Sequence, residues 1–227
     1  MKLDKNFFSE NIKTLLYALI IAIIIRSLLI QPFYIPSSSM EPTLLVGDRL
    51  FVTKYSYGYS KHSFPFSPPI LNERILFNSP ERGDVVVFKT PADNRTDYIK
   101  RLIGLPGDEI SYKNKQIKIN GDLLANKFQY VYKNTKQYGA HVYEERIGKK
   151  THLALLTPSR RGKEGVFEVP EGHYFFMGDN RDNSKDGRYD CPGYVPRNHI
   201  VGKATTIWFN WDFSSLPEWN RIGKSID

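Results

Sequence analysis

The segment that most constrains the fold is an apolar run near the N-terminus. Residues 15–25 are all apolar or Tyr, and the run continues past Arg26 to Ile30. As a helix, residues 12–30 would be about 28 Å long, close to the ~30 Å thickness of a bilayer's hydrocarbon core. We therefore expect one transmembrane anchor at residues 12–30, preceded by a short N-terminal segment at residues 1–11.

The basic residues around this segment predict its orientation. Lys2, Lys5 and Lys13 lie at its N-terminal end, whereas the next basic residue after Arg26 is Arg49. By the positive-inside rule the N-terminus is cytoplasmic, and everything after the anchor lies on the periplasmic or extracytoplasmic side of the cell's inner (plasma) membrane. The sequence thus predicts a single-pass membrane protein.

A cleaved signal peptide is the alternative interpretation of the same segment. Its h-region would be residues 15–25, and Ser37 or Ser39 would be the small residue before the cut. Two features argue against cleavage, namely the extension of the apolar run past Arg26 and the proline at position 42 just after the supposed cut.

The charge of the chain suggests an anionic partner. Its formal net charge is +8, which suits either nucleic acid or membrane headgroups. The basic residues are scattered and form no nucleic-acid-binding signature, so we expect membrane lipid and no nucleic acid. Cys191 is the only cysteine, which excludes an intrachain disulfide and zinc sites of the Cys-pair type.

After the anchor, the sequence predicts a mostly β protein. No stretch beyond residue 30 keeps a 3.6-residue apolar period over three turns. Strands are expected within residues 47–55, 82–91, 98–108, 166–169, 173–177 and 200–208, and an alternating stretch at 110–119 leads to the hairpin dipeptide Asn120-Gly121.

Two intervals differ from the rest of this β region. Residues 109–172 have weaker apolar periodicity and are expected to form a small inserted β subdomain, with 31–108 and 173–227 forming the main β domain. Residues 58–80 are rich in proline and aromatic residues and predict a long loop. Its Phe64 and Phe66 either pack on the domain or contact the membrane surface.

Three consecutive serines after the anchor suggest a nucleophile. The stretch P-S-S-S-M-E-P-T-L spans residues 36–44, and Pro36 and Pro42 prevent a regular helix there. A serine hydroxyl needs a base. The five histidines lack a recurring His-Asp context, which leaves Lys100, in a predicted strand, as a candidate. A lysine acts as base near neutral pH only if its pKa falls by about 2–3 units.

Five motifs in order resemble bacterial type I signal peptidase, a Ser–Lys membrane protease. They are P-S-S-S-M-E-P-T-L (36–44), G-D-R-L-F-V-T-K (47–54), R-G-D-V-V-V-F (82–88), Y-I-K-R-L-I-G-L-P-G-D (98–108) and G-D-N-R-D-N-S-K-D-G-R (178–188). The resemblance implies an enzyme that removes N-terminal signal peptides from exported preproteins at Ala-x-Ala-like sites, needs no cofactor or metal, and is monomeric.

The same resemblance assigns roles to individual residues. Ser39 is the nucleophile and Lys100 the general base, Ser37 assists the oxyanion site, and Ser184 orients the lysine amine. Other members of the site fall into two groups: structural ion pairs from Arg101, Asp179, Asp186 and Arg188, and a substrate pocket from Phe33, Ile35, Leu44 and Ile99. Gly187 departs from the family pattern, in which Ser or a similar residue is usual.

Three alternatives remain open from the sequence. Residues 182–187 match the start of an EF-hand loop, but position twelve is Gly193 and no helices flank it, so we expect no calcium site. The chain would otherwise be a narrower Ser–Lys processing peptidase of a secretion or conjugation system. A non-enzymatic, membrane-tethered β domain that binds exported polypeptides is the third alternative.

Overall fold

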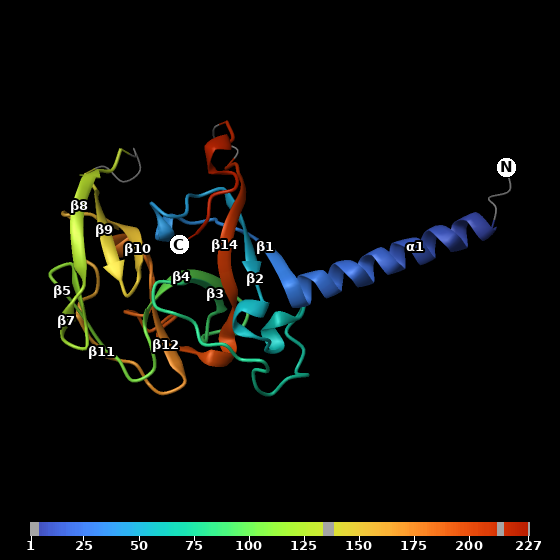
Figure 1. Ribbon diagram of the computed structural model, residues 1–227, viewed down its shortest axis with the longest axis horizontal. Coiled ribbons are helices and arrows are strands. Elements are labelled where there is room, and N and C mark those ends of the chain that lie inside the picture. The colour runs from blue at the N-terminus through green and yellow to red at the C-terminus, as the bar shows by residue number, and fades with distance from the viewer. Residues whose placement is uncertain (1–4, 134–138, 213–215, 227) are drawn as a thin grey trace.

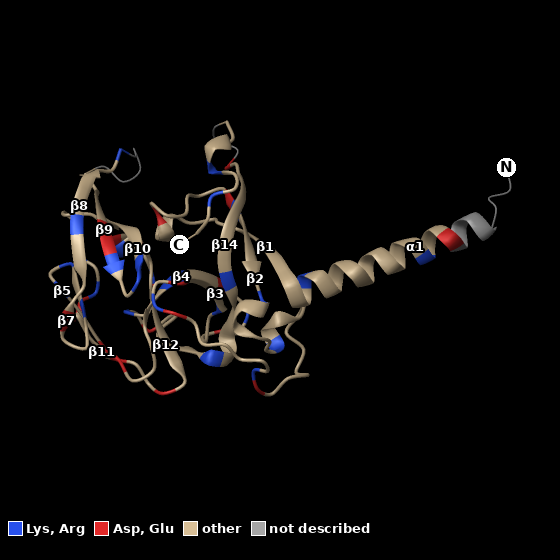
Figure 2. Ribbon diagram, in the orientation of Figure 1, with Lys and Arg blue, Asp and Glu red and all other residues tan. Residues whose placement is uncertain are grey.

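The computed structural model describes residues 5–133, 139–212 and 216–226. Helix α1 (Lys5–Ile24) stands away from a β-rich body (Figure 1), and a π-helical turn, η1 (Ile25–Leu29), joins the two. Among the described residues, one helical span, Glu10–Leu29, is long and apolar enough to cross a membrane, with a mean hydropathy of 2.1. Charged residues lie only towards its two ends (Figure 2), as expected for an anchor.

The body contains one large sheet, with strand order β1-β2-β14-β3-β4-β12-β13. Its strands are β1 (Ile30–Tyr34), β2 (Asp48–Thr53), β3 (Val85–Lys89), β4 (Asp97–Gly104), β12 (His173–Met177), β13 (Val195–Pro196) and β14 (Ile200–Asn210). Every neighbouring pair is antiparallel. The chain therefore passes directly from the membrane helix into an edge strand of this sheet.

Both faces of the sheet are buried where its central strands meet. Val85 and Val87 pack into one hydrophobic cluster with Leu50 and Val52, whereas Val86 and its neighbours pack into a second on the opposite face. This alternation follows from the period of two along a strand. The uninterrupted valines of β3 are thus explained by a strand covered on both sides.

Residues between β4 and β12 form two smaller sheets, with orders β11-β5-β6-β7 and β10-β9-β8. The strands are β5 (Glu109–Lys113), β6 (Gln116–Ile119), β7 (Asp122–Leu123), β8 (Ala125–Val131), β9 (His141–Ile147), β10 (Lys150–Leu156) and β11 (Gly165–Glu168). Ile110 and Ile147 share a buried cluster with Phe175 of the large sheet. The inserted region therefore packs onto the main body through a common core.

The alternating stretch at 110–119 is a hairpin rather than one strand. Asn114 and Lys115 both have positive φ, 49° and 62°, and form the turn between β5 and β6. Asn120 and Gly121, with φ of 52° and 87°, make the next turn as predicted. The turn at Asn114 and Lys115 contains no glycine, which is why the sequence did not predict it.

The C-terminal tail returns along β14 to the serine-bearing end of the sheet. Within it, η8 (Trp219–Arg221) precedes a bridge between Ser225 and Thr206. Arg221 donates to buried Asp48 at the start of β2, with 2.7 Å from Nε to Oδ1. Residues 213–215 and 227 of the tail lie outside the described residues.

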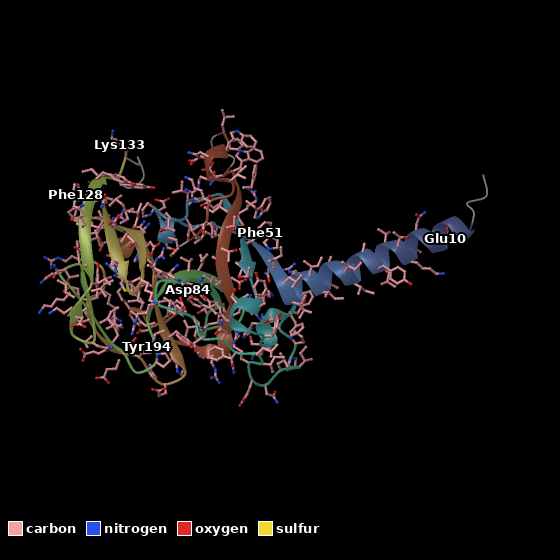
Figure 3. All side chains as sticks on the ribbon, in the orientation of Figure 1. Glu10, Phe51, Asp84, Phe128, Lys133 and Tyr194 are labelled. Carbon is pink, nitrogen blue, oxygen red and sulfur yellow. The ribbon has the colours of Figure 1, made fainter. Side chains whose placement is uncertain are left out.

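Short 3₁₀ turns complete the described elements. They are η2 (Ser38–Met40), η3 (Tyr55–Tyr57), η4 (Lys61–Ser63), η6 (Arg181–Asn183) and η7 (Arg197–His199). Asp84, labelled in Figure 3, lies inside the body and accepts hydrogen bonds from Tyr57, from Lys150 of β10 and from Lys203 of β14. One buried carboxylate thus joins the inserted sheets to the main sheet.

Candidate active site

Ser39 lies in the short turn η2, between the edge strand β1 and strand β2. The turn is held by Met40 on its far side, which is buried in the hydrophobic core beside Ile35. Ile35 itself accepts a hydrogen bond from the Gly47 N–H and donates to the Asp48 carbonyl. Only 8% of Ser39 is exposed. The serine is therefore presented from a fixed backbone rather than from a free loop.

Lys100 of β4 reaches Ser39 across the body. Its Nζ lies 2.7 Å from Ser39 Oγ and 2.9 Å from the carbonyl oxygen of Ile99. Only 4% of the residue is exposed. Burial lowers the pKa of Lys100 to about 8, because the charges of Asp186 and Asp179 offset only part of the loss of hydration. A measurable fraction of the amine is therefore neutral near pH 7.

A cavity of about 400 Å³ opens onto this pair. Phe33, Ile35 and Ile99 line it together with Ser37, Ser39 and Lys100, so most of the predicted pocket residues lie around the reactive atoms. Leu44, which was also predicted to line the substrate pocket, is not among the residues that line this cavity. It is fully buried in the hydrophobic core with Met40, because its backbone folds back onto the same turn.

Ser37 and Ser184 both lie close to the nucleophile. Ser37 Oγ lies 3.4 Å from Ser39 Oγ. Ser184 is buried, and its Oγ packs against Gly178 at the point where Gly178 meets the Ser39 carbonyl. Within the described part of the chain, this hydroxyl has no hydrogen-bond partner. The predicted contact between Ser184 and the Lys100 amine is therefore not formed in this structure.

Two fully buried ion pairs lie beside the site, and they are formed by the four residues expected to make structural ion pairs. Arg101 donates to both oxygens of Asp179 at 2.8 Å, and Asp179 also accepts from Thr43 Oγ1 at 2.6 Å. Arg188 donates to both oxygens of Asp186 at 2.8 and 2.9 Å. Burial acts to raise the pKa of Asp179, but the Arg101 charge and the hydrogen bonds from Arg101 and Thr43 together lower it and hold the carboxyl ionised.

The segment 178–188 also holds the serine turn through groups that the sequence did not single out. Asn180 donates from its backbone N–H to the Ser39 carbonyl at 3.1 Å and from its side chain to the Ser38 carbonyl at 3.0 Å. Asn183 donates to Ser38 Oγ at 2.9 Å. Both asparagines belong to the fifth motif, residues 178–188, and this is the feature of the sequence that could have marked them as site residues.

Gly187 has a packing reason for its departure from the family pattern. A Cβ at this position would lie 2.8 Å from the ring of Phe175 and 2.9 Å from the Phe176 carbonyl oxygen. Real Cβ atoms essentially never approach so closely. The large Phe175 side chain beneath residue 187 therefore requires glycine there.

A second buried ionic cluster connects the inserted sheets to the site. Arg181 donates to Glu145 of β9, with 2.7 Å from Nη1 to Oε1. His152 of β10 lies between this pair and the Arg101–Asp179 pair. Its Nε2 is 3.4 Å from Glu145 and 4.0 Å from Asp179. No role for these three residues could be predicted from the sequence, because they come together only when β9 and β10 pack behind the segment 178–188.

Taken together, the geometry suits acyl transfer by a serine. The site contains a hydroxyl, an adjacent amine with a lowered pKa, and a second hydroxyl beside the first.

Comparison with known proteins adds the following similarities. A family described as "Signal peptidase, peptidase S26" matches residues 8–211. The chain is 41% identical to a signal peptidase I from Pseudomonas fluorescens, covering 98% of this chain and 81% of that protein. It is 39% identical to one from Rickettsia typhi, covering 86% and 80%. A solved signal peptidase I from Enterococcus faecalis V583 is 28% identical, with a TM-score of 0.35, covering 56% of this chain and 97% of that one.

Proposed function

This chain belongs to the signal peptidase family, peptidase S26, and we propose that it removes N-terminal signal peptides from exported preproteins with a Ser39–Lys100 dyad. The main support for this dyad is the distance of 2.7 Å between Lys100 Nζ and Ser39 Oγ inside a buried site. An unpaired lysine is seldom buried so fully without a function.

In this mechanism the neutral Lys100 amine takes the proton of Ser39 while Oγ attacks the scissile carbonyl. The resulting ammonium then gives its proton to the leaving amine, which releases the mature protein and leaves the signal peptide esterified to Ser39. Lys100 next takes a proton from the water that attacks the ester carbonyl and returns it to Ser39 Oγ as the signal peptide leaves. The Ile99 carbonyl, 2.9 Å from Nζ, directs the amine during both steps.

The developing oxyanion requires two hydrogen-bond donors. The Ser39 backbone N–H supplies one and the Ser37 hydroxyl supplies the second, since Ser37 Oγ lies beside the nucleophile. Ser184 is a positioning residue for Lys100. Its buried Oγ has no hydrogen-bond partner among the described residues, and we infer that it contacts the Lys100 amine once a substrate occupies the site.

The substrate binds as an extended chain along β1. That strand is the edge of the large sheet, paired with β2 on one side, and its residues line the cavity opposite β4. An added strand satisfies the edge's backbone groups and places alternate side chains in the cavity. Phe33, Ile35 and Ile99 restrict that space, which favours small residues such as Ala at the two positions facing it.

The test is cleavage of one purified preprotein by the full chain and its variants. Ser39→Ala and Lys100→Ala should each abolish processing, and Lys100→Arg should do the same, since a guanidinium remains charged and cannot accept the proton. Asn183→Ala, which removes a hydrogen bond to Ser38 Oγ and leaves Ser39 and Lys100 in place, should retain measurable activity.

Circular dichroism of each variant separates loss of chemistry from loss of fold. Wild-type activity in Lys100→Arg would refute the assigned base. No processing by the wild type, with preprotein binding unchanged in Ser39→Ala and Lys100→Ala, would instead indicate that the chain binds exported polypeptides without cutting them.

A further inference from the structure

A second, larger cavity lies beside the catalytic cavity and has no role in the mechanism above. Its volume is about 950 Å³, and it lies between the end of the membrane helix, the loop at residues 58–80 and the turn before β4. Asp97 lines both cavities, so the two are neighbours. Its walls combine basic side chains with aromatic ones: Arg26, Lys61, Lys89, Arg95, Phe64 and Phe66.

Three of the four cations in this cavity have no anionic partner among the described residues. Lys89 pairs with Asp97, with 2.9 Å between Nζ and Oδ1. Asp93, the other carboxylate in the wall, accepts hydrogen bonds from Thr96 and from the backbone N–H of Arg95. Arg26, Lys61 and the Arg95 guanidinium therefore leave a net positive charge facing the cavity.

The buried histidine of the cavity wall responds to this charge. The pKa of His62 falls to about 4, first because the ring is buried and then because positive groups, Lys61 and Lys89 among them, lie around it. The ring stays neutral near pH 7 and bonds Ser67 Oγ at 2.9 Å through Nδ1. The wall thus favours an anion over a further cation.

Phe66 is presented to the solvent by a strained turn. Its side chain is fully exposed, and its φ of 63° is rare for a bulky residue. Ser67, with φ of 51°, follows it and is held by the bond to His62. Strain of this kind persists where the surrounding structure enforces it, which is often at ligand sites.

The cavity also lies at the level of the membrane surface. Arg26 is within the last turn of the apolar span Glu10–Leu29. Tyr59 of the loop donates from its hydroxyl to the Leu28 carbonyl at 2.9 Å, which fixes the loop to that end of the span. An arginine at this depth extends its head group to the phosphate layer.

We propose that this cavity binds the headgroup of an anionic phospholipid. Arg26, Lys61 and Arg95 contact the phosphate diester, and Phe66 enters the acyl-chain region beside it. The occupied site seats the loop on the bilayer next to the entrance of the catalytic cavity. Phosphatidylglycerol has the required net negative charge, whereas phosphatidylcholine is neutral overall.

The test measures binding by the full chain in neutral detergent micelles and does not depend on peptidase activity. Short-chain phosphatidylglycerol, short-chain phosphatidylcholine and inorganic phosphate are titrated separately. We expect phosphatidylglycerol to bind at least tenfold more tightly than either of the other two. Because each basic residue at an anionic surface contributes roughly fivefold, Lys61→Gln with Arg95→Gln should weaken its binding about five- to thirtyfold.

A charge-matched control comes from the far side of the molecule. Lys118→Gln with Lys127→Gln removes two exposed lysines from β6 and β8, and binding should not change. Phe66→Ser should weaken binding of phosphatidylglycerol and leave that of phosphate unchanged. Equal binding of the two lipids, or equal losses in both double variants, would overturn the proposal. Phosphate binding as tight as phosphatidylglycerol, with no effect of Phe66→Ser, would indicate an ion site without lipid.

Discussion

Lys100 is held in an environment that disfavours its charged form. The amine is almost fully buried, and the two nearest carboxylates named above are already paired with Arg101 and Arg188. Its pKa of about 8 lies below the 10.5 of a free lysine. This single difference has one consequence for the rate and another for stability.

The rate of cleavage should follow the neutral fraction of Lys100. We expect kcat/KM to rise about tenfold per pH unit below pH 8 and to level off above it, because only the uncharged amine accepts the Ser39 proton. The measurement is cleavage of a soluble peptide substrate from pH 6 to 10, over the range where the fold is intact. A rise centred near 10.5 would mean that burial does not lower the pKa.

Removing the amine should stabilise the fold while destroying activity. A folded pKa of about 8 against 10.5 in the unfolded chain means that the buried charge costs about 3 kcal/mol. The cost grows as the pH falls from 10.5 to 8 and is complete below 8. Lys100→Met should therefore raise the free energy of unfolding by up to about 3 kcal/mol at pH 7 and leave it nearly unchanged at pH 11.

Urea titrations of the detergent-solubilised chain at both pH values provide the measurement. A variant that loses stability at pH 7 would show that the amine's hydrogen bonds to Ser39 and Ile99 outweigh its lost hydration.

Among the elements, strands β9 and β10 affect the site although none of their residues faces the catalytic cavity. Glu145 is fully buried against Arg181, and burial alone would raise its pKa. The Arg181 charge and the hydrogen bonds outweigh burial and lower the pKa to about 2. The carboxylate therefore stabilises the fold above pH 4.5, and this contribution is lost as the pH falls through about 2.

Glu145→Gln should destabilise the protein by about 3–5 kcal/mol at pH 7, because Arg181 would remain buried without a counter-charge. Glu144→Gln, at the neighbouring exposed position, should change stability by less than about 0.5 kcal/mol. The measurement is denaturant unfolding at pH 7 and pH 3, and the difference between wild type and Glu145→Gln should shrink at the lower pH. Equal effects of the two substitutions would show that the cluster does not stabilise the fold.

The elements differ in how far the sequence predicted them. Strands of the large sheet such as β3 and β14 were expected, because long runs of branched and aromatic residues stand between turn residues. Strands β8 to β10 were not predicted individually. In β8 every residue is exposed, so burial imposes no alternation of apolar and polar residues on it. The motif residues Ser39 and Lys100 were found in the sequence, whereas their 2.7 Å contact depends on long-range pairing that no local pattern encodes.

For the whole molecule, the membrane helix and the β body should lie on opposite sides of the bilayer surface. Residues 1–11 are cytoplasmic in our proposal, since the basic residues before the span outnumber those just after it. Protease added to intact spheroplasts should digest a C-terminal tag and spare an N-terminal one. Protection of the C-terminal tag in spheroplasts, with digestion of the N-terminal one, would require the reverse orientation.

The direct passage from η1 into β1 sets a length. Ile30 begins the edge strand at the membrane exit and Ser39 follows nine residues later, a distance of at most about 30 Å for an extended chain. Hydrogen bonds from Lys54 to Leu29 and from Tyr59 to Leu28 keep the helix end from moving relative to the sheet. The nucleophile is thus held at a constant height above the lipid. We therefore expect the distance of a peptide bond from the end of its substrate's own membrane segment to help determine which bond is cut.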